Sequence, residues 1–224
     1  PAMLSDSGYR MIQSGSFELF VDVGNIGPDY IPGHAHSDSL SFVLCADDRP
    51  VIVDVATSTY ENGSVRLFER STGAHNTVML GDLQQSEVWA SFRVGRRAKI
   101  TQREEDNHSI TASHDGYKSV GVTHKRSWIW GEGEIRIKDE ISQKNQNMKS
   151  VAFIHFHPDV DVKIEDDFIQ ADVVRIKCTG QKFFEIGEYE FAAGYNKVQK
   201  GKVLRIYFDN HLQTILGFRQ TSEP

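Results

Sequence analysis

Short runs of β-branched and aromatic residues recur along almost the whole chain, and turn-forming residues separate them. Runs of this length at short intervals are typical of antiparallel strands, not of alternating strands and helices. Only Val65–Ser71 has a pattern that suits one or two helical turns. The sequence therefore predicts one all-β domain over residues 1–224, a large multi-stranded antiparallel β-sandwich with few or no helices. The predicted strands are Phe17–Val23, Leu40–Cys45, Val51–Val55, Thr77–Leu80, Val122–Trp130, Ile135–Ile141, Val151–Phe156, Val173–Cys178, Val203–Phe208 and Leu212–Phe218.

The hydropathy pattern within these runs predicts which faces are buried. Apolar and charged residues alternate in Ile135–Ile141, so one face should meet the core and the other should meet water. Leu40–Cys45 and Val51–Val55 are apolar on both faces, which favours a central hairpin. Trp128 and Trp130 share one face of a strand and are expected in the core. The predicted turns are Asp47-Asp48-Arg49-Pro50, Glu61-Asn62-Gly63, Gly131-Glu132-Gly133 and Asp209-Asn210.

Charge and cysteine content limit the classes of function. The formal net charge is −6 at pH 7, which excludes bulk nucleic-acid binding, and an anionic ligand would need locally clustered arginine or lysine. No apolar run reaches the length of about 18 residues that suggests a membrane span. Cys45 and Cys178 lie in apolar runs without metal-type spacing, so we expect free thiols.

Three segments carry residues with metal-ligand chemistry. The first is Gly33-His34-Ala35-His36-Ser37-Asp38, which leads into a strand; the second is Asp54, inside an apolar strand; the third is His75, before the next strand. Imidazole nitrogen and carboxylate oxygen are ligands that zinc prefers, and three protein ligands suffice for a site. The hairpin brings His36 and Asp54 to one end, but whether they share a face depends on a register that the sequence does not fix. Asp38 has a simpler interpretation, as the cap of a turn.

Two familiar metal motifs do not fit this segment. Metallo-β-lactamase-type hydrolases open with a similar His-x-His-x-Asp, but their next position is a histidine, and here it is Ser39. A cupin would place glutamate four or five residues after its His-x-His, where this chain has Leu40 and Ser41.

The chain resembles the C-terminal domain of the heparinase II/III-like polysaccharide lyases over about residues 8–130, with several separate motifs in the same order. Beyond residue 130 only the strand pattern is similar. The motifs are Gly33-His34-Ala35-His36-Ser37-Asp38-Ser39-Leu40-Ser41-Phe42, Val53-Asp54, Ser58-Thr59-Tyr60, Arg70-Ser71-Thr72, Ala74-His75-Asn76-Thr77-Val78, Trp89-Ala90-Ser91-Phe92-Arg93-Val94-Gly95-Arg96-Arg97-Ala98, His114-Asp115-Gly116-Tyr117 and His124-Lys125-Arg126.

This resemblance implies a fold and an activity. In the family a helical toroid precedes the antiparallel sandwich, substrate lies between the two, and uronate-containing polysaccharides are cleaved by β-elimination. It implies that His36, Asp54 and His75 hold a zinc ion whose role is mainly structural. No helical domain is present in this chain, so we expect that domain of the same polypeptide as its partner. A periplasmic or secreted location is expected, with any export signal outside these residues.

The resemblance also assigns roles to residues around the cleft. His34 matches the histidine at the reacting centre, as general base or carboxylate neutraliser, and Tyr60 matches a tyrosine that contacts substrate. Arg66 and Arg70, with Asn76, are the candidate substrate-binding residues; surface ion pairing is the alternative for the two arginines. Arg93, Arg96 and Arg97 are expected in structural ion pairs.

Two other functions stay open at this point. One is a non-catalytic carbohydrate-binding or structural sandwich that keeps a structural zinc. The other is a metallohydrolase that uses zinc-bound water, for which Asp38 is the candidate acid.

Overall fold

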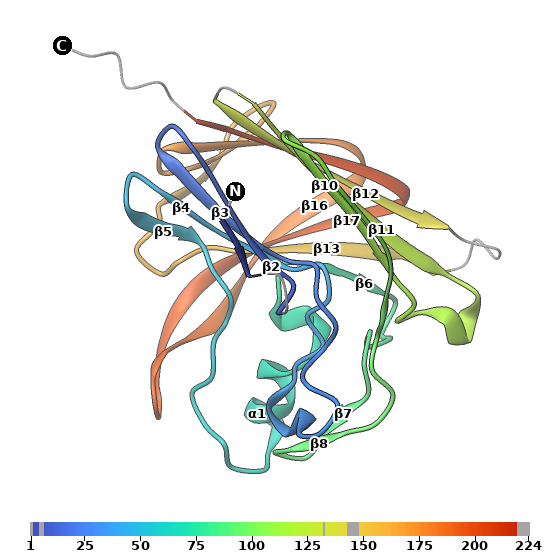
Figure 1. The fold of residues 1–224 in the computed structure, drawn as a ribbon. Coiled ribbons are helices and arrows are strands. Elements are labelled where there is room, and N and C mark those ends of the chain that lie inside the picture. The colour runs from blue at the N-terminus through green and yellow to red at the C-terminus, as the bar shows by residue number, and fades with distance from the viewer. Residues whose placement is uncertain (1, 5–6, 132, 143–147, 219–224) are drawn as a thin grey trace.

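The computed structural model describes residues 2–4, 7–131, 133–142 and 148–218 and shows an all-β fold, as predicted. Two large antiparallel sheets pack against each other, and a smaller lobe extends below them (Figure 1). No helix in the described ranges is long and apolar enough to cross a membrane.

The first sheet has five strands in the order β1-β2-β3-β4-β5. Its inner face is apolar because every second residue of β3 and β4 points to the core, including Phe17, Leu19 and Leu44. The strands are β1 (Ala2–Leu4), β2 (Tyr9–Ser14), β3 (Phe17–Asp22), β4 (Phe42–Ala46) and β5 (Arg49–Ile52).

The second sheet has ten strands, and eight of them follow the order β14-β15-β16-β17-β12-β11-β10-β9. The other two, β13 and β6, pair with each other, and β13 also pairs with β17. The strands are β6 (Val78–Leu80), β9 (Ile100–Glu105), β10 (Ser109–His114), β11 (Thr123–Gly131), β12 (Glu134–Ser142), β13 (Ser150–His155), β14 (Val162–Ile164), β15 (Ile169–Ala171), β16 (Val174–Gly194) and β17 (Lys197–Phe218).

The main core lies between the two sheets. Trp128 and Trp130 are buried there on one face of β11, as predicted. The sheets also meet near the end of β17, where the rings of Phe17 and Phe218 stack with centroids 4.5 Å apart. Cys45 and Cys178 are free and partly buried.

The predicted turn at Asp209-Asn210 is wrong, because β17 runs through it without interruption. This position is where β17 changes neighbour: it pairs with β13 up to Phe208 and with β12 from His211 onward. Along the other edge of β17, the register of its pairing with β16 shifts at Gly180. The φ of Gly180 is +89°, a backbone conformation that glycine adopts readily. The turn-type residues thus mark a bulge between two pairings, not a chain reversal.

The predicted central hairpin forms as β4 and β5, which pair antiparallel. Only β4 is central, since β5 is the last strand of its sheet and reaches the second sheet through the single bridge Ile52–Phe156. Asp54 therefore follows the end of a strand, in an irregular segment that leads into the lower lobe.

The lower lobe contains the expected helical turn, α1 (Ser64–Glu69), and the two-stranded sheet of β7 (Val88–Trp89) and β8 (Arg93–Val94) (Figure 1). The far end of the β16–β17 hairpin is tied to the segment that enters this lobe. Ala192 N donates to Val55 O (2.9 Å), and Asn196 N donates to Ser58 O (2.7 Å). The described ranges also contain the short 3-10 helices η1 (Pro32–His34), η2 (Thr72–Ala74) and η3 (Lys118–Val120).

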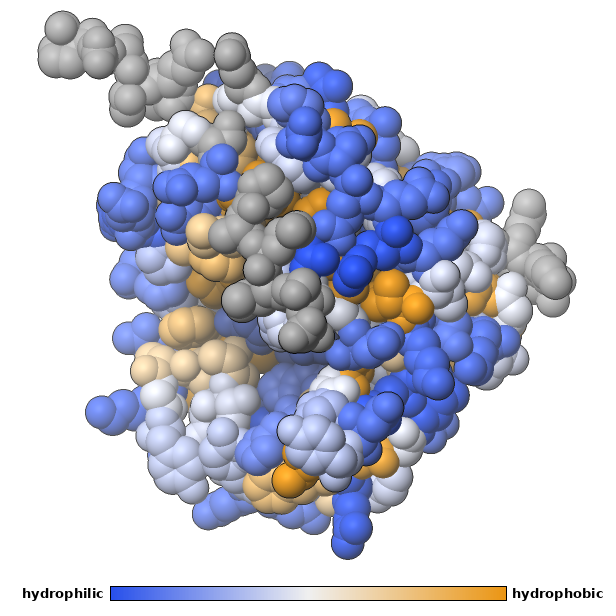
Figure 2. All heavy atoms as spheres, viewed as in Figure 1, coloured by the Kyte–Doolittle hydropathy of each residue, from blue (hydrophilic) through white to orange (hydrophobic). Residues whose placement is uncertain are grey.

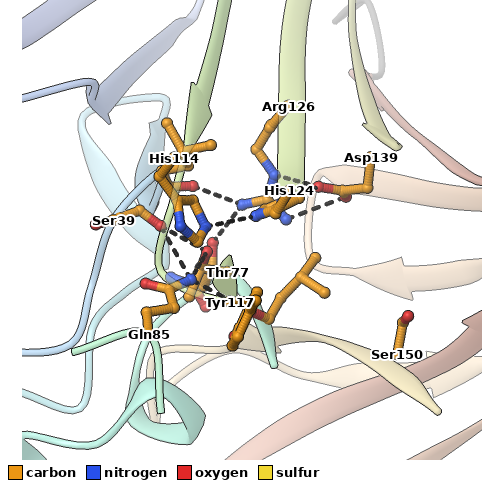
Figure 3. A network of polar contacts seen from close by, with 12 residues as sticks. Ser39, Thr77, Gln85, His114, Tyr117, His124, Arg126, Asp139 and Ser150 are labelled. Carbon is orange, nitrogen blue, oxygen red and sulfur yellow. Dashed lines mark hydrogen bonds and ion pairs between the residues drawn. The ribbon is translucent and has the colours of Figure 1, made fainter. Parts of the chain in front are cut away.

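A buried polar network crosses the core beside these loops (Figure 3). Arg126 donates to both oxygens of Asp139 (2.7 and 3.1 Å), and its Nη1 donates to Leu40 O and Asn76 O (both 2.7 Å). His124 Nε2 donates to the same carboxylate (2.7 Å). Burial alone would raise the pKa of Asp139, but the charge of Arg126 and the His124 hydrogen bond outweigh it and lower the pKa to about 2.

We expect Arg126→Met to lower the free energy of unfolding by about 3–5 kcal/mol, because it leaves the Asp139 carboxylate buried without its ion-pair partner. Urea denaturation at pH 7 measures this loss. The matched control is Arg136→Met, since Arg136 is half exposed and pairs with Glu134 at the surface, so about 0–1 kcal/mol is expected. Equal losses in the two variants would contradict the structural role of the network.

Candidate active site and metal centre

A cleft of about 990 Å³ opens between the two sheets and the loop that joins β3 to β4. The space-filling view shows a recess on this face, between the upper part of the molecule and the lower lobe (Figure 2). The chemically active side chains that line the cleft come from three places: Tyr9 and Asp22 from the first sheet, His34, His36 and Asp38 from the loop, and Arg103 from β9.

The loop that carries the histidines is held by the segment after α1. Arg70 donates from Nε and Nη2 to Ala35 O (3.1 and 2.9 Å), and Ser37 N donates to Arg70 O (2.9 Å). The Ser37 hydroxyl lies 2.8 Å from that of Thr72. These contacts fix the backbone between His34 and Asp38.

His36, Asp38 and His75 form a group whose candidate ligand atoms all lie within 4.8 Å of one another. The two imidazole rings are 5.3 Å apart between centroids. Burial, with the charge of His75, lowers the pKa of His36 to about 3, so its ring is neutral. Burial raises the pKa of Asp38.

His75 is oriented by Asp54, as a metal-binding histidine commonly is by a carboxylate. Its Nδ1 donates to Asp54 Oδ2 (2.5 Å), while its Nε2 is buried and has no hydrogen-bond partner among the described residues. Burial alone would lower the pKa of His75, but the charge and hydrogen bond of Asp54 raise it. A cation at Nε2 would satisfy the unpaired nitrogen and complete the carboxylate–histidine–metal arrangement. The residues thus fit a metal ion.

The structure brings His36 and His75 together and groups them with Asp38, whose candidate ligand atom lies within 4.8 Å of theirs. Asp54 contacts the outer side of His75, and its own Oδ1 accepts from Ala56 N (3.2 Å). Asp38 begins a turn whose hydrogen bond joins its backbone carbonyl to Ser41 N (3.1 Å), and the cap by its side chain stays a prediction. Asp54 as a direct ligand stays a prediction, and Asp38 is a second candidate for that position.

His34 is exposed on the cleft wall and is held by aromatic rings. Its imidazole meets Tyr60 and Phe92 edge to face, with centroids 5.7 and 5.2 Å apart, and the Tyr60 and Phe92 rings stack at 5.8 Å. Within the described part of the chain, the imidazole nitrogens of His34 have no hydrogen-bond partner. The sequence analysis did not single out Phe92, because an aromatic residue on an irregular segment is indistinguishable from an ordinary surface residue.

Arg66 lies behind this aromatic group and is buried. Its guanidinium carbon is 5.0 Å from the Tyr60 ring centroid, its Nη1 donates to Thr57 Oγ1 (3.2 Å), and the same nitrogen lies 3.5 Å from His36 Nε2. Arg66 thus links Tyr60 to the metal-ligand candidates. Its predicted contact with substrate stays a prediction.

Arg70 and Asn76 are buried and bind parts of the protein itself. Arg70 donates to the carbonyls of Ala35, Ala90 and Arg93. Asn76 Nδ2 donates to Phe42 O and Val53 O (both 2.8 Å), and its Oδ1 accepts from the backbone N of His155 (2.7 Å). Neither lines the cleft, and their predicted substrate contacts stay predictions.

Two of the three arginines expected in structural ion pairs make them, and Arg93 shows none among the described residues. Arg97 Nη2 lies 2.6 Å from Asp29 Oδ1, and Arg96 Nε lies 3.7 Å from Glu87 Oε1.

Comparison with known families and structures gives a consistent result. The sequence profile of the family described as "Heparinase II/III-like, C-terminal" matches residues 1–210. Among solved structures, a heparinase III gene product with methylated lysines is 16% identical with a TM-score of 0.75 and is aligned over 99% of this chain and 36% of its own. The heparan sulfate lyase from Pedobacter heparinus is 16% identical with a TM-score of 0.75, over 100% and 37%. A further structure of heparinase III is 13% identical with a TM-score of 0.71, over 97% and 36%.

The search of curated protein sequences gave no match. The solved structures share the fold of this chain, which spans little more than a third of their length.

We expect Asp38→Asn and Asp54→Asn to affect metal binding differently. If Asp38 is the ligand, its variant loses a charged donor and zinc binding largely disappears, whereas Asp54→Asn weakens binding by about 10–100-fold because His75 is less well oriented. Competition with a chelator measures the Kd of each variant, and exposed Asp48→Asn is the control. The opposite ranking would identify Asp54 as the ligand, as the sequence analysis expects.

We also expect His155 to make the fold less stable in acid. Burial lowers its pKa to about 3, so below about pH 6.5 the unfolded chain binds a proton that the folded chain does not. The free energy of unfolding should therefore fall with pH between about 6.5 and 3, by at most about 1.4 kcal/mol per pH unit from this group. Urea denaturation should show a shallower fall for His155→Gln than for the control His211→Gln, which changes an exposed histidine. Parallel slopes would contradict the assignment.

Proposed function

Since the chain belongs to the heparinase II/III-like C-terminal family, we propose that it is the sandwich half of a polysaccharide lyase that cleaves uronate-containing polysaccharide by β-elimination. The observation that carries the proposal is the placement of His34 on the wall of an open cleft. Its imidazole nitrogens have no hydrogen-bond partner among the described residues, and Tyr60 lies beside it. His36 and Asp38, two of the three metal-ligand candidates, line the same cleft.

The elimination needs a base on one side of the sugar and an acid at the leaving oxygen. An imidazole such as that of His34 is a common general base and suits the removal of the proton α to the uronate carboxylate. The electron pair of that C–H bond forms a carbon–carbon double bond, the bond to the glycosidic oxygen breaks, and that oxygen takes a proton from the acid. Tyr60 contacts the sugar beside His34.

We propose zinc as the metal, held by His36, His75 and a carboxylate. When bound, it supplies a structural tie at the cleft floor. The residues themselves keep His36 neutral and His75 oriented, and they fix the backbone that presents His34. Asp54, as ligand or as the partner of His75, keeps the site charge-balanced.

We propose a helical domain of the same polypeptide as the partner that closes the cleft. A sugar on the open wall stays hydrated, and hydration keeps its α-proton weakly acidic. The partner would exclude water and supply the further acid/base group that elimination needs. An extracellular polymer as substrate suits a periplasmic or secreted location.

We expect low lyase activity from this chain alone, since a misplacement of the catalytic groups by about 1 Å can lower the rate about 10²-fold. Joined to a helical domain it should form unsaturated product, followed by ultraviolet absorbance on heparan-type, chondroitin-type and alginate-type polymers. In that form His34→Ala should lower kcat by about 10²-fold or more with an unchanged melting temperature. Exposed His211→Ala is the control.

Two results would contradict the proposal. One is a His34→Ala enzyme as active as the unaltered one. The other is robust turnover by residues 1–224 alone, because the catalytic set would then lie wholly within the sandwich.

A further inference from the structure

The proposed substrate is an anion, but the arginines predicted to bind it do not reach the cleft. Arg66 and Arg70 are 1% and 0% exposed, and their donors are directed to the protein itself. Among the described residues that line the cleft, the one arginine or lysine is Arg103, on β9. Arg103 is therefore the candidate among the arginine and lysine side chains for binding a negative group in this cleft.

The register of β9 explains why the Arg103 side chain enters the cleft. β9 is the last strand of its sheet, and Arg103 lies opposite Ala112, which is buried on the inner face of β10. Side chains two residues apart share a face of a strand, so Arg103 and Glu105 both point toward the first sheet. Their contact, with Arg103 Nε 3.1 Å from Glu105 Oε1, is consistent with this direction.

Glu105 anchors Arg103 without neutralising it. Arg10, which is 4% exposed, already binds both oxygens of this carboxylate, from Nε (2.8 Å) and Nη2 (3.0 Å). Two guanidinium groups thus share one carboxylate, and the trio keeps one net positive charge. The terminal Nη groups of Arg103 have no partner in the described part of the chain, and its side chain is 40% exposed.

Asp22 and Asp38 also line the cleft, so the Arg103 guanidinium is the part of the lining whose charge attracts a negative group. A guanidinium with free terminal donors matches the two oxygens of a carboxylate or sulfate group in a bidentate contact.

We propose that Arg103 is the anion-recognition residue of the cleft and binds a carboxylate or sulfate group of an acidic sugar through its terminal Nη donors. The inference rests on the proposed function. It assigns the contact with the anionic ligand to Arg103 instead of to Arg66 and Arg70. Arg10 and Glu105 are positioning residues for it.

Calorimetric titration of the 224-residue chain tests this assignment with three oligosaccharides of equal length: an unsulfated oligouronate, a sulfated heparan-type oligomer and a neutral glucan. Arg103→Gln should bind the anionic oligomers about tenfold or more weakly, since a charge-assisted bidentate contact is lost. The affinity of Arg103→Lys should lie between those of Arg103→Gln and the unaltered chain, because lysine keeps the charge but lacks the planar guanidinium group. Arg136→Gln, which removes the same charge from the exposed face of β12, should change binding by less than about twofold.

Each outcome has one meaning. Weaker binding of both anionic oligomers by Arg103→Gln identifies a carboxylate contact, and weaker binding of the sulfated one alone identifies a sulfate contact. Equal affinity of Arg103→Gln and the unaltered chain, with the neutral glucan bound poorly, overturns the inference and leaves the proposed function intact. Equal binding of neutral and anionic oligomers contradicts the proposed function itself, and no binding by the unaltered chain overturns the inference. Melting temperatures of all variants should agree, because Arg103 is partly exposed.

Discussion

The buried pair of Arg126 and Asp139 is the interaction on which the rest of the site depends. Asp139 is on β12 and Arg126 on β11, and the guanidinium reaches out of their sheet to the carbonyls of Leu40 and Asn76. Leu40 follows Asp38 at the end of the cleft loop, and Asn76 follows His75. One side chain thus holds both backbone segments that carry metal-ligand candidates. A hydrophobic pair could fill the same volume, but it could not donate to those two carbonyls.

The cleft is built by loops that the sheets position. Asp54 orients His75, while Arg126 and Arg70 hold the backbone on either side of the metal-ligand candidates. Two aromatic rings hold His34 and leave its nitrogens open to the cleft. The arrangement separates residues that hold the site together, which are buried and paired, from residues that face a ligand, which have unpaired donors.

The fold class, the β4–β5 hairpin and the buried tryptophans could be predicted from the sequence, because apolar periodicity records which face of a strand meets the core. The proximity of His36 and His75 could also be predicted, from the family motifs that contain them. The choice between Asp38 and Asp54 did not, because it depends on loop geometry that periodicity does not encode. The burial of Arg66 and Arg70 could not be predicted either, because the sequence does not distinguish an arginine that binds carbonyl groups from one that binds a sugar. Arg103 lies in a polar edge strand that shows almost no apolar alternation.

The contacts that define the site join positions very far apart along the chain. Arg126 meets Leu40 across 86 residues, His155 meets Asn76 across 79, and Arg10 meets Glu105 across 95. Chains dominated by such non-local contacts fold slowly, because loop closure costs entropy before the contacts form. The segments that hold His36 and His75 cannot reach their final positions until β11 and β12 have joined the first sheet. Binding of the proposed zinc should therefore be among the last events of folding, and its rate would report when the chain has become native.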